Sequence, residues 1–186
     1  MKVTFVLPYA GMHGGIKVVA IYARLLRDRG HVINVISVMK KPLSLRARVR
    51  TILKQKKWQP KQRGQGKTYF DDSDPSWVIL NHTGPVTDHD IPDADVVIAT
   101  WWETAEWINS LSPEKGVKVY FCQGFETHII RHRKRVEATY SLAIKKICVS
   151  NWVGHKIYSL TGVDDHEVVK NGVDLKQFYP AKYISR

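Results

Sequence analysis

Acidic residues are absent from Arg29 to Phe70, and this gap shows which part of the chain carries the net positive charge. The 186 residues include 29 Lys and Arg against 17 Asp and Glu, a net charge of +12. Eleven of the basic residues lie between Lys40 and Lys67, which leaves 18 elsewhere to balance the 17 acidic ones. The basicity therefore belongs to one insertion-like segment, residues 40–67, and not to the protein as a whole.

Long apolar runs and cysteines are also scarce. No run approaches the ~20 residues that span a membrane. The opening MKVTFVLPYAG is too short and too β-branched for a signal peptide, and predicts a first strand. Cys122 and Cys148 each lie in an apolar, strand-like run. Two buried, reduced thiols in a cytosolic protein are the main prediction, with a disulfide as the alternative.

Several catalytic motifs are missing. The glycines of residues 11–15 lack the GxGxxG spacing, and no acidic residue follows the second predicted strand, which argues against NAD. No GxSxG elbow is present, which argues against nucleophilic hydrolysis. His82, Asp88, His89 and Asp90 lack a recognised ligand spacing such as HExxH and fall in a loop that Pro interrupts, so no metal site is expected.

Runs rich in Val and Ile alternate with segments of helical periodicity. The predicted strands are 2–7, 31–38, 77–80, 94–100, 117–122, 144–150 and 166–170, and the predicted helices are 16–29, 103–111, 128–142 and 151–160. Ser150 is placed to cap the last helix and Gly162 to end it. This alternation predicts an α/β, Rossmann-like parallel sheet with helices on both faces.

The loops that follow the predicted strands meet at the carboxyl edge of such a sheet, where ligands bind. His13, Gly14 and Gly15 lie in the first of these loops. Glycines let a backbone come close to a ligand, and the following helix start favours an anion. A tight turn with no ligand is the alternative for this loop.

A second loop has the sequence TWWETAEW, residues 100–107. Trp101 and Trp102 are candidates to stack on a sugar while Glu103 accepts a hydroxyl. The alternative is that at least one Trp belongs to the core.

A third loop follows the strand 117–122. Gln123 can hydrogen-bond a hydroxyl but cannot act as a base, whereas Glu126 can, if its pKa is tuned. The alternative for Glu126 is a solvated residue that opens the next helix. Ser150, after a later strand, is primarily a helix cap, a role compatible with ligand contact at the same helix end.

The tail EVVKNGVDLKQFYP, residues 167–180, runs from a short strand into Asn171 and Gly172, where a sharp turn with positive φ is expected. This tail resembles the inter-domain crossover of glycosyltransferase family four, whose members have the GT-B architecture of two facing Rossmann-like domains. The opening VLPYAGMHGGIKVVAIYARLLRDRGHVINVIS resembles the start of the same enzymes. Where many of them carry a cleft histidine at the end of the strand corresponding to 117–122, this chain has Gln123.

The resemblance implies that residues 1–180 are the N-terminal, acceptor-side domain of a retaining, hexosyltransferase-like enzyme, and that 181–186 begin the linker to a C-terminal domain. Such enzymes take a nucleotide-sugar as co-substrate and need no cofactor or metal. The implied acceptor is a glycan, a lipid-linked sugar or another molecule, with nucleic acid not expected. Asn171 is implied to lie at the cleft. Because the donor motifs belong to the other domain, residues 1–186 are expected to be monomeric, folded and inactive.

The basic segment is predicted to be an amphipathic helix. Leu45, Val49, Ile52 and Leu53 share one side of a helical wheel, and the other side carries Arg46, Arg50, Lys54 and Lys57, hereafter the basic quartet. This helix can lie on an anionic membrane, bind nucleic-acid phosphates, or pack as a solvated helix on the domain. The first alternative predicts a cytoplasmic enzyme that is peripheral at the inner membrane face.

A rival interpretation from another class is a stand-alone basic, Rossmann-like module that binds anionic membrane or nucleic acid. A reading frame that continues for ~150–200 residues with a second βαβ pattern would reject this rival, because domains of that size fold separately. A stop codon near Arg186 would favour it.

Overall fold

The computed structural model describes residues 1–40, 68–70 and 76–173. The predicted amphipathic helix, the basic quartet and the tail beyond residue 173 lie outside the described residues. Among the described residues, no helix is both long and apolar enough to cross a bilayer.

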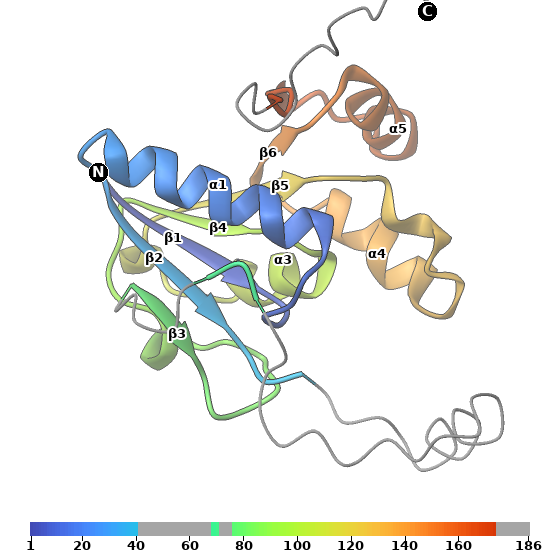
Figure 1. The fold of residues 1–186 in the computed structure, drawn as a ribbon. Helices are drawn as coiled ribbons and strands as arrows, with labels where there is room; N and C mark the ends of the chain where they lie inside the picture. Colours follow the sequence, from blue (N-terminus) through green and yellow to red (C-terminus); the bar gives the residue numbers. More distant parts are fainter. Residues whose placement is uncertain (41–67, 71–75, 174–186) are drawn as a thin grey trace, which may run out of the picture.

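The described residues form one seven-stranded sheet in which every neighbouring pair is parallel (Figure 1). In chain order its strands are β1 Lys2–Leu7, β2 Val32–Ser37, β3 Trp77–Ile79, β4 Val96–Ala99, β5 Val117–Cys122, β6 Lys145–Cys148 and β7 His166–Val168. Their order across the sheet is β3-β2-β1-β4-β5-β6-β7. The predicted α/β, Rossmann-like parallel sheet is confirmed.

Helices cover both faces of the sheet, because the strands are apolar on both sides. The α-helices are α1 Gly14–Asp28, α3 Trp102–Asn109, α4 Arg133–Tyr140 and α5 Asn151–Thr161. On one face, Ile16, Val19 and Ala23 of α1 pack on side chains of β1 and β2. On the other face, α3, α4 and α5 share a core with side chains of β1, β4, β5 and β6. The helices thus divide between the faces as they do in doubly wound folds (Figure 1).

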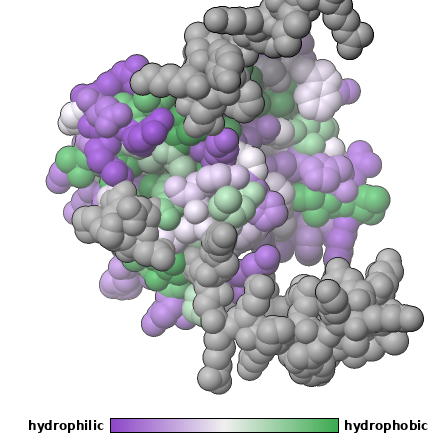
Figure 2. Space-filling view, viewed as in Figure 1, coloured by the Kyte–Doolittle hydropathy of each residue, from purple (hydrophilic) through white to green (hydrophobic). Residues whose placement is uncertain are grey.

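Figure 2, in the same view, shows apolar and polar side chains interspersed over the visible surface. Ile21 and Leu25 of α1, for instance, are 36% and 39% exposed. Single apolar residues scattered among polar ones are ordinary on the surface of a folded domain.

Most predicted elements agree with the structure to within two residues, but the helix expected over 128–142 does not. The chain first makes two 3-10 turns, η3 Glu126–His128 and η4 Ile130–His132, and only then enters α4. Ile129 between the turns has φ −77° and ψ 71°, which is outside the helical region. Two further 3-10 turns, η1 Asp88–Asp90 and η2 Pro113–Lys115, lie before β4 and β5.

The ends of α5 follow the sequence prediction. The Ser150 side chain accepts a hydrogen bond from the backbone N–H of Val153, at 3.3 Å, and so caps the helix. Gly162 adopts the left-handed conformation, with φ 70°, and ends it. The sharp turn with positive φ that the sequence predicts at Asn171 and Gly172 is not found at Gly172, which does not adopt a positive φ.

Both cysteines are buried, as predicted, and are free thiols. Cys122 ends β5 and lies in register with Cys148, which ends β6. Burial raises the pKa of the Cys122 thiol well above its ordinary value, so this group packs as a neutral side chain.

Candidate functional site

The sheet reverses its direction of growth between β1 and β4, and the chain leaves these strands toward opposite faces. In open parallel sheets, ligands bind at the carboxyl ends of the strands where this reversal occurs. Here the Thr100 hydroxyl, just after β4, donates to the carbonyl oxygen of Val6 in β1, at 2.9 Å. The Thr104 hydroxyl oxygen accepts from the backbone N–H groups of Thr100 and Trp101, each at 3.0 Å. These bonds fix both strand ends. We call this place the switch-point crevice, after the position where open parallel sheets bind ligands.

The glycine loop, residues 8–13, joins β1 to α1 and forms one side of the switch-point crevice. His13 precedes α1 without a side-chain hydrogen bond to it, and no acidic residue lies in the first turn. Neither Gly14 nor Gly15 adopts a positive φ, so the backbone conformation does not require glycine at either position. Apart from its chain neighbours and the backbone of its own helix, no atom of the described residues lies within 4 Å of the place where a Cβ on Gly14 would be. A ligand can therefore approach the helix start closely.

Sequence reasoning missed two side chains here: Tyr9 lies beside His13, and Lys40 lies over the ring of Tyr9. The Tyr9 ring meets the His13 ring edge-on, with 5.5 Å between centroids. The Lys40 ammonium lies 5.5 Å from the centroid of the Tyr9 ring. Lys40 follows β2 at the carboxyl edge, and this position was the signal that could have identified it. Its charge and the start of α1 give this side of the crevice a positive potential.

Gln123 brings the loop after β5 against the glycine loop. Its side-chain Nε2 donates to the carbonyl oxygen of Gly15, at 3.2 Å. A Cβ on Gly15 would lie 3.3 Å from the Gln123 amide, which is a tight contact. Gly15 and Gln123 therefore lie at the same edge of the sheet, as their positions after β1 and β5 predict.

Glu126 is buried directly behind this edge, with 4% of its surface exposed. Its Oε2 accepts from the backbone N–H of Trp102, at 3.3 Å, and from the Tyr120 hydroxyl, at 3.2 Å. Burial raises the pKa of Glu126 from 4.5 to about 7, against the lowering effect of these two hydrogen bonds. The alternative of a solvated residue is therefore wrong. The carboxyl group connects the loop after β5 to the start of α3 and can take up a proton near neutral pH.

Stacked aromatic rings support Glu126. Tyr120 and Tyr140 stack with 5.9 Å between centroids, and Phe125 stacks on Tyr140 at 5.4 Å. The Tyr140 oxygen accepts from the backbone N–H of Glu126, at 2.9 Å. Burial raises the pKa of Tyr140 above its ordinary value, so the phenol stays neutral beside the carboxyl group. The position of Glu126 is thus fixed by packing as well as by hydrogen bonds.

The two adjacent tryptophans of residues 100–107 differ in their surroundings. Trp102 is 3% exposed and belongs to the core. The His132 ring stacks on it at 5.5 Å, and the Arg135 guanidinium lies 4.8 Å from its centroid. This covering corrects the expectation that the Trp102 ring faces a sugar, and the alternative of one core tryptophan is confirmed. Trp101 is half-buried beside the crevice, and Glu103 is half-exposed in the first turn of α3.

The remaining predicted site residues lie after the outer strands. Ser150 follows β6 and serves as the cap of α5 described above. Asn171 lies three residues beyond the end of β7 and is exposed. β7 is at the far side of the sheet from the switch point, separated from β4 by β5 and β6. Both residues lie at the carboxyl edge, but β4, β5 and β6 separate β7 from the crevice.

The histidine and aspartate loop before β4 is tied together internally. His82 Nε2 lies 3.2 Å from Asp90 Oδ1. Asp90 Oδ2 accepts from both the backbone N–H and the hydroxyl of Thr87, at 2.7 Å each. In the part of the chain that the structure describes, no group of three or more His, Cys, Asp or Glu side chains is arranged to hold a metal ion.

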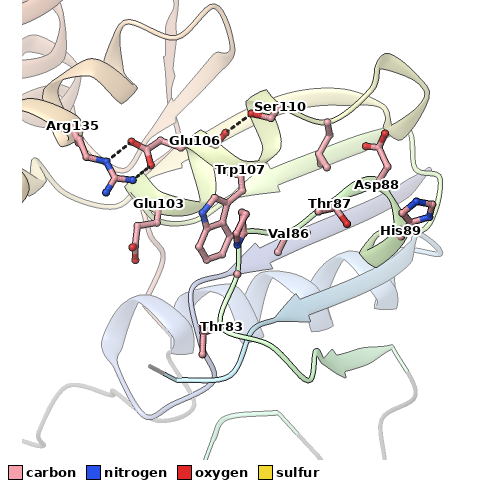
Figure 3. A pocket seen from close by; sticks show the side chains of 13 residues that line it. Thr83, Val86, Thr87, Asp88, His89, Glu103, Glu106, Trp107, Ser110 and Arg135 are labelled. Atoms are coloured by element: carbon pink, nitrogen blue, oxygen red, sulfur yellow. Dashed lines mark hydrogen bonds and ion pairs between the residues drawn. The ribbon is translucent and has the colours of Figure 1, made fainter. Parts of the chain in front are cut away.

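A pocket of about 720 Å³ lies between this loop and α3 (Figure 3). Residues 83–89 form one wall, and Glu103, Glu106 and Trp107 of α3, with Ser110 just beyond its end, form the other, with Arg135 at one end. Sequence reasoning missed this pocket, although Trp107 lies on the same predicted helix as Glu103. Its wall consists of two segments whose contact is tertiary, and no local pattern predicts such a contact.

No protein-family model matches this chain, and no curated protein matches it in sequence. Among solved structures, it is similar to an alpha-glucosyltransferase in complex with UDP and a 13-mer DNA containing an HMU base. The TM-score is 0.55 at 11% identity, over 95% of this chain and 44% of the other. An alpha-glucosyltransferase in complex with UDP and a 13-mer DNA containing a central A:G mismatch gives a TM-score of 0.44 at 9% identity, over 81% and 37%.

The first likeness supports the fold alone, and the second is too distant to support an argument. The chain spans less than half the length of either neighbour. The first neighbour is a complex with DNA, so the prediction that nucleic acid is not a partner gains no support from it.

Proposed function

We propose that this chain is the acceptor-side, N-terminal domain of a glycosyltransferase that uses a nucleotide-sugar donor. The observation that carries the proposal is the switch-point crevice, where an unobstructed Gly14 lies at the start of a 15-residue helix. The similarity of fold to an alpha-glucosyltransferase that holds UDP supports it. The resemblance of residues 6–37 and 167–180 to family four supports the same assignment.

The crevice suits a ligand that carries phosphate. The start of α1 offers backbone N–H groups and a partial positive charge, and Lys40 adds a full one. In sugar transfer from a nucleotide donor, the diphosphate departs with negative charge, and fixed dipoles aimed at it lower the barrier. His13 and the glycine loop are the groups that we expect to contact the donor from this domain.

Gln123 and Glu126 have separate roles in this proposal. The Gln123 amide, held on the carbonyl oxygen of Gly15, orients the acceptor hydroxyl. Glu126 is a positioning residue, because its carboxyl group faces the Trp102 N–H and the Tyr120 hydroxyl. It keeps the loop that carries Gln123 against α3, where Trp101 and Glu103 can contact the acceptor sugar.

The finer assignments follow the family resemblance. We propose a retaining, hexosyltransferase-like reaction of family four without metal or cofactor, in a cleft completed by a second domain beyond residue 180. In this proposal Ser150 and Asn171 border that cleft, and residues 1–186 alone are monomeric and inactive. The acceptor is a glycan or a lipid-linked sugar.

A peripheral membrane location is proposed on the basis of charge. Residues 40–67 carry 11 basic residues and no acidic one. Basic residues near an anionic surface contribute about 1 kcal/mol each. The basic quartet would then hold a cytoplasmic enzyme at the inner membrane face, next to a lipid-linked acceptor.

The test uses the polypeptide encoded by the complete reading frame, hereafter the full-length polypeptide, and residues 1–186 as its control. Each is incubated with UDP-, GDP- and dTDP-sugars, and nucleotide release is measured by chromatography. We expect release by the full-length polypeptide and none by residues 1–186. Failure of the full-length polypeptide to bind or turn over any nucleotide-sugar would refute the proposal.

A further inference from the structure

The pocket beside α3 is a groove that begins near the switch-point crevice and extends away from it. Glu103 lies in the first turn of α3, and Ser110 directly follows its last residue. The opposite wall, residues 83–89, runs alongside the helix (Figure 3). Its volume of about 720 Å³ lies within the range of about 300–1,000 Å³ found for small-molecule sites. We call it the α3 groove.

Trp107 supplies the aromatic wall of the α3 groove, and its position is fixed by the loop opposite. Gly84 has φ +85°, and a Cβ there would lie 2.7 Å from the Trp107 ring. Only glycine therefore lets the loop lie this close to the ring. The ring also packs against the core on α3, so it is held rigidly while it lines the groove. A rigid aromatic surface binds a ligand with little loss of side-chain freedom.

The charge of the α3 groove excludes phosphate-rich ligands. Its lining holds three carboxylates, from Asp88, Glu103 and Glu106, against one guanidinium, from Arg135. Arg135 already makes a two-bond ion pair with Glu106, with Nε to Oε1 at 3.2 Å and Nη2 to Oε2 at 2.5 Å. The Asp88 carboxylate accepts from the backbone N–H of Ser112, at 3.0 Å. A nucleic acid or a diphosphate would face net negative charge here.

We propose that the α3 groove binds the neutral sugar units of an oligosaccharide acceptor, next to the proposed transfer site. This inference rests on the proposed function and adds a substrate class to it. A pyranose ring has an apolar face that suits Trp107 and a rim of hydroxyls that donate to carboxylates such as Glu103. Since Glu103 lies in the first turn of α3, four residues after the end of β4, one acceptor chain can extend from the crevice along α3.

The test measures binding of uncharged trisaccharides to the full-length polypeptide without donor. Maltotriose, cellotriose and N,N′,N″-triacetylchitotriose are the probes, observed by saturation-transfer NMR, and a 13-mer duplex DNA is tested by fluorescence anisotropy. We expect at least one trisaccharide to bind. Trp107→Ala should weaken that binding by about tenfold, equivalent to about 1.4 kcal/mol. Glu103→Gln, which changes no core side chain, should weaken it by a smaller factor.

Trp152→Ala is the matched control, because Trp152 is 58% exposed on α5 and does not line the α3 groove. It should leave trisaccharide binding unchanged. Absence of trisaccharide binding, binding that Trp107→Ala and Glu103→Gln both leave intact, or DNA binding that requires Trp107 would each overturn the inference.

Failure of this inference is distinguishable from failure of the proposed function. Trisaccharide binding through Trp107 without nucleotide-sugar turnover would refute the proposed glycosyltransferase function but not sugar binding in the α3 groove. Turnover without trisaccharide binding would support the proposed function and refute sugar binding in the α3 groove.

Discussion

Replacing Glu126 with Gln keeps the shape of the side chain and removes its ability to ionise. Both hydrogen bonds that Oε2 accepts, from the Trp102 N–H and the Tyr120 hydroxyl, can be accepted by a Gln oxygen. The variant therefore isolates one quantity, the free-energy cost of ionising the buried Glu126 carboxyl group in the folded protein. Because Glu126 connects the loop after β5 to α3, this property also reports on how firmly the candidate site is assembled.

The magnitude follows from the pKa of Glu126, which the fold raises from 4.5 to about 7. At about 1.36 kcal/mol for each pKa unit, ionisation in the folded state costs about 3 kcal/mol. Well below pH 4.5 Glu126 is protonated in both states and takes nothing from the free energy of unfolding. As pH rises toward 7, the unfolded chain releases this proton first, so the free energy of unfolding falls. Above pH 7 no further change comes from this group.

The assay is urea unfolding of the wild type and of Glu126→Gln, followed by tryptophan fluorescence from pH 4.5 to 8.5. Between pH 4.5 and 8.5, the free energy of unfolding of the variant should rise by about 3 kcal/mol relative to that of the wild type. With a urea dependence of about 2 kcal/mol per molar, the two midpoints should separate by about 1.5 M. Glu167→Gln, at an exposed position on β7, is the control and should follow the wild type. Parallel pH profiles for wild type and Glu126→Gln would refute our account of a buried, protonatable carboxyl group.

Three further predictions concern stability and membrane binding. Ser150→Ala removes the cap of α5 and should lower the free energy of unfolding by about 1 kcal/mol, whereas Ser159→Ala, on the exposed surface of the same helix, should not lower it. Lys146 is 2% exposed and pairs with Asp165 at 2.7 Å; Lys146→Met leaves that carboxylate unpaired and should cost about 3 kcal/mol in urea unfolding. Changing the basic quartet to Gln should abolish co-sedimentation with anionic vesicles, and equal binding by wild type and variant, or no preference for anionic over neutral lipid, would contradict the membrane proposal.

The sequence predicts the fold well where local signals and tertiary packing agree. Alternating strands and helices predict the parallel sheet, and Ser150 and Gly162 mark the ends of α5 correctly because caps depend on residues close in sequence. The prediction of a helix over 128–142 was wrong because tertiary contacts override the local pattern there. There the Glu126 N–H bonds to Tyr140, 14 residues away, and the chain makes two 3-10 turns first.

The candidate site is predictable only in outline. Positions after strands predict that Gly15 and Gln123 share one edge, and their hydrogen bond agrees with this. The burial of Glu126 is not predictable, because it depends on the neighbours Trp102 and Tyr120, which other segments contribute. The α3 groove is hidden for the same reason, since the contact of Gly84 with Trp107 joins segments about 20 residues apart.

Glycosyl transfer by the full-length Gly14→Ala variant tests the central claim most directly. Gly14 has no positive φ and, among the described residues, no atom near its Cβ position, so the fold does not require glycine there. Alanine should stabilise the start of α1 by about 0.5 kcal/mol. If a nucleotide-sugar approaches this backbone, the same methyl group should lower kcat/KM for the donor by at least about tenfold, equivalent to about 1.4 kcal/mol. A variant that is more stable and far less active is the predicted result, whereas full activity would contradict the assignment of the switch-point crevice as the site of sugar transfer.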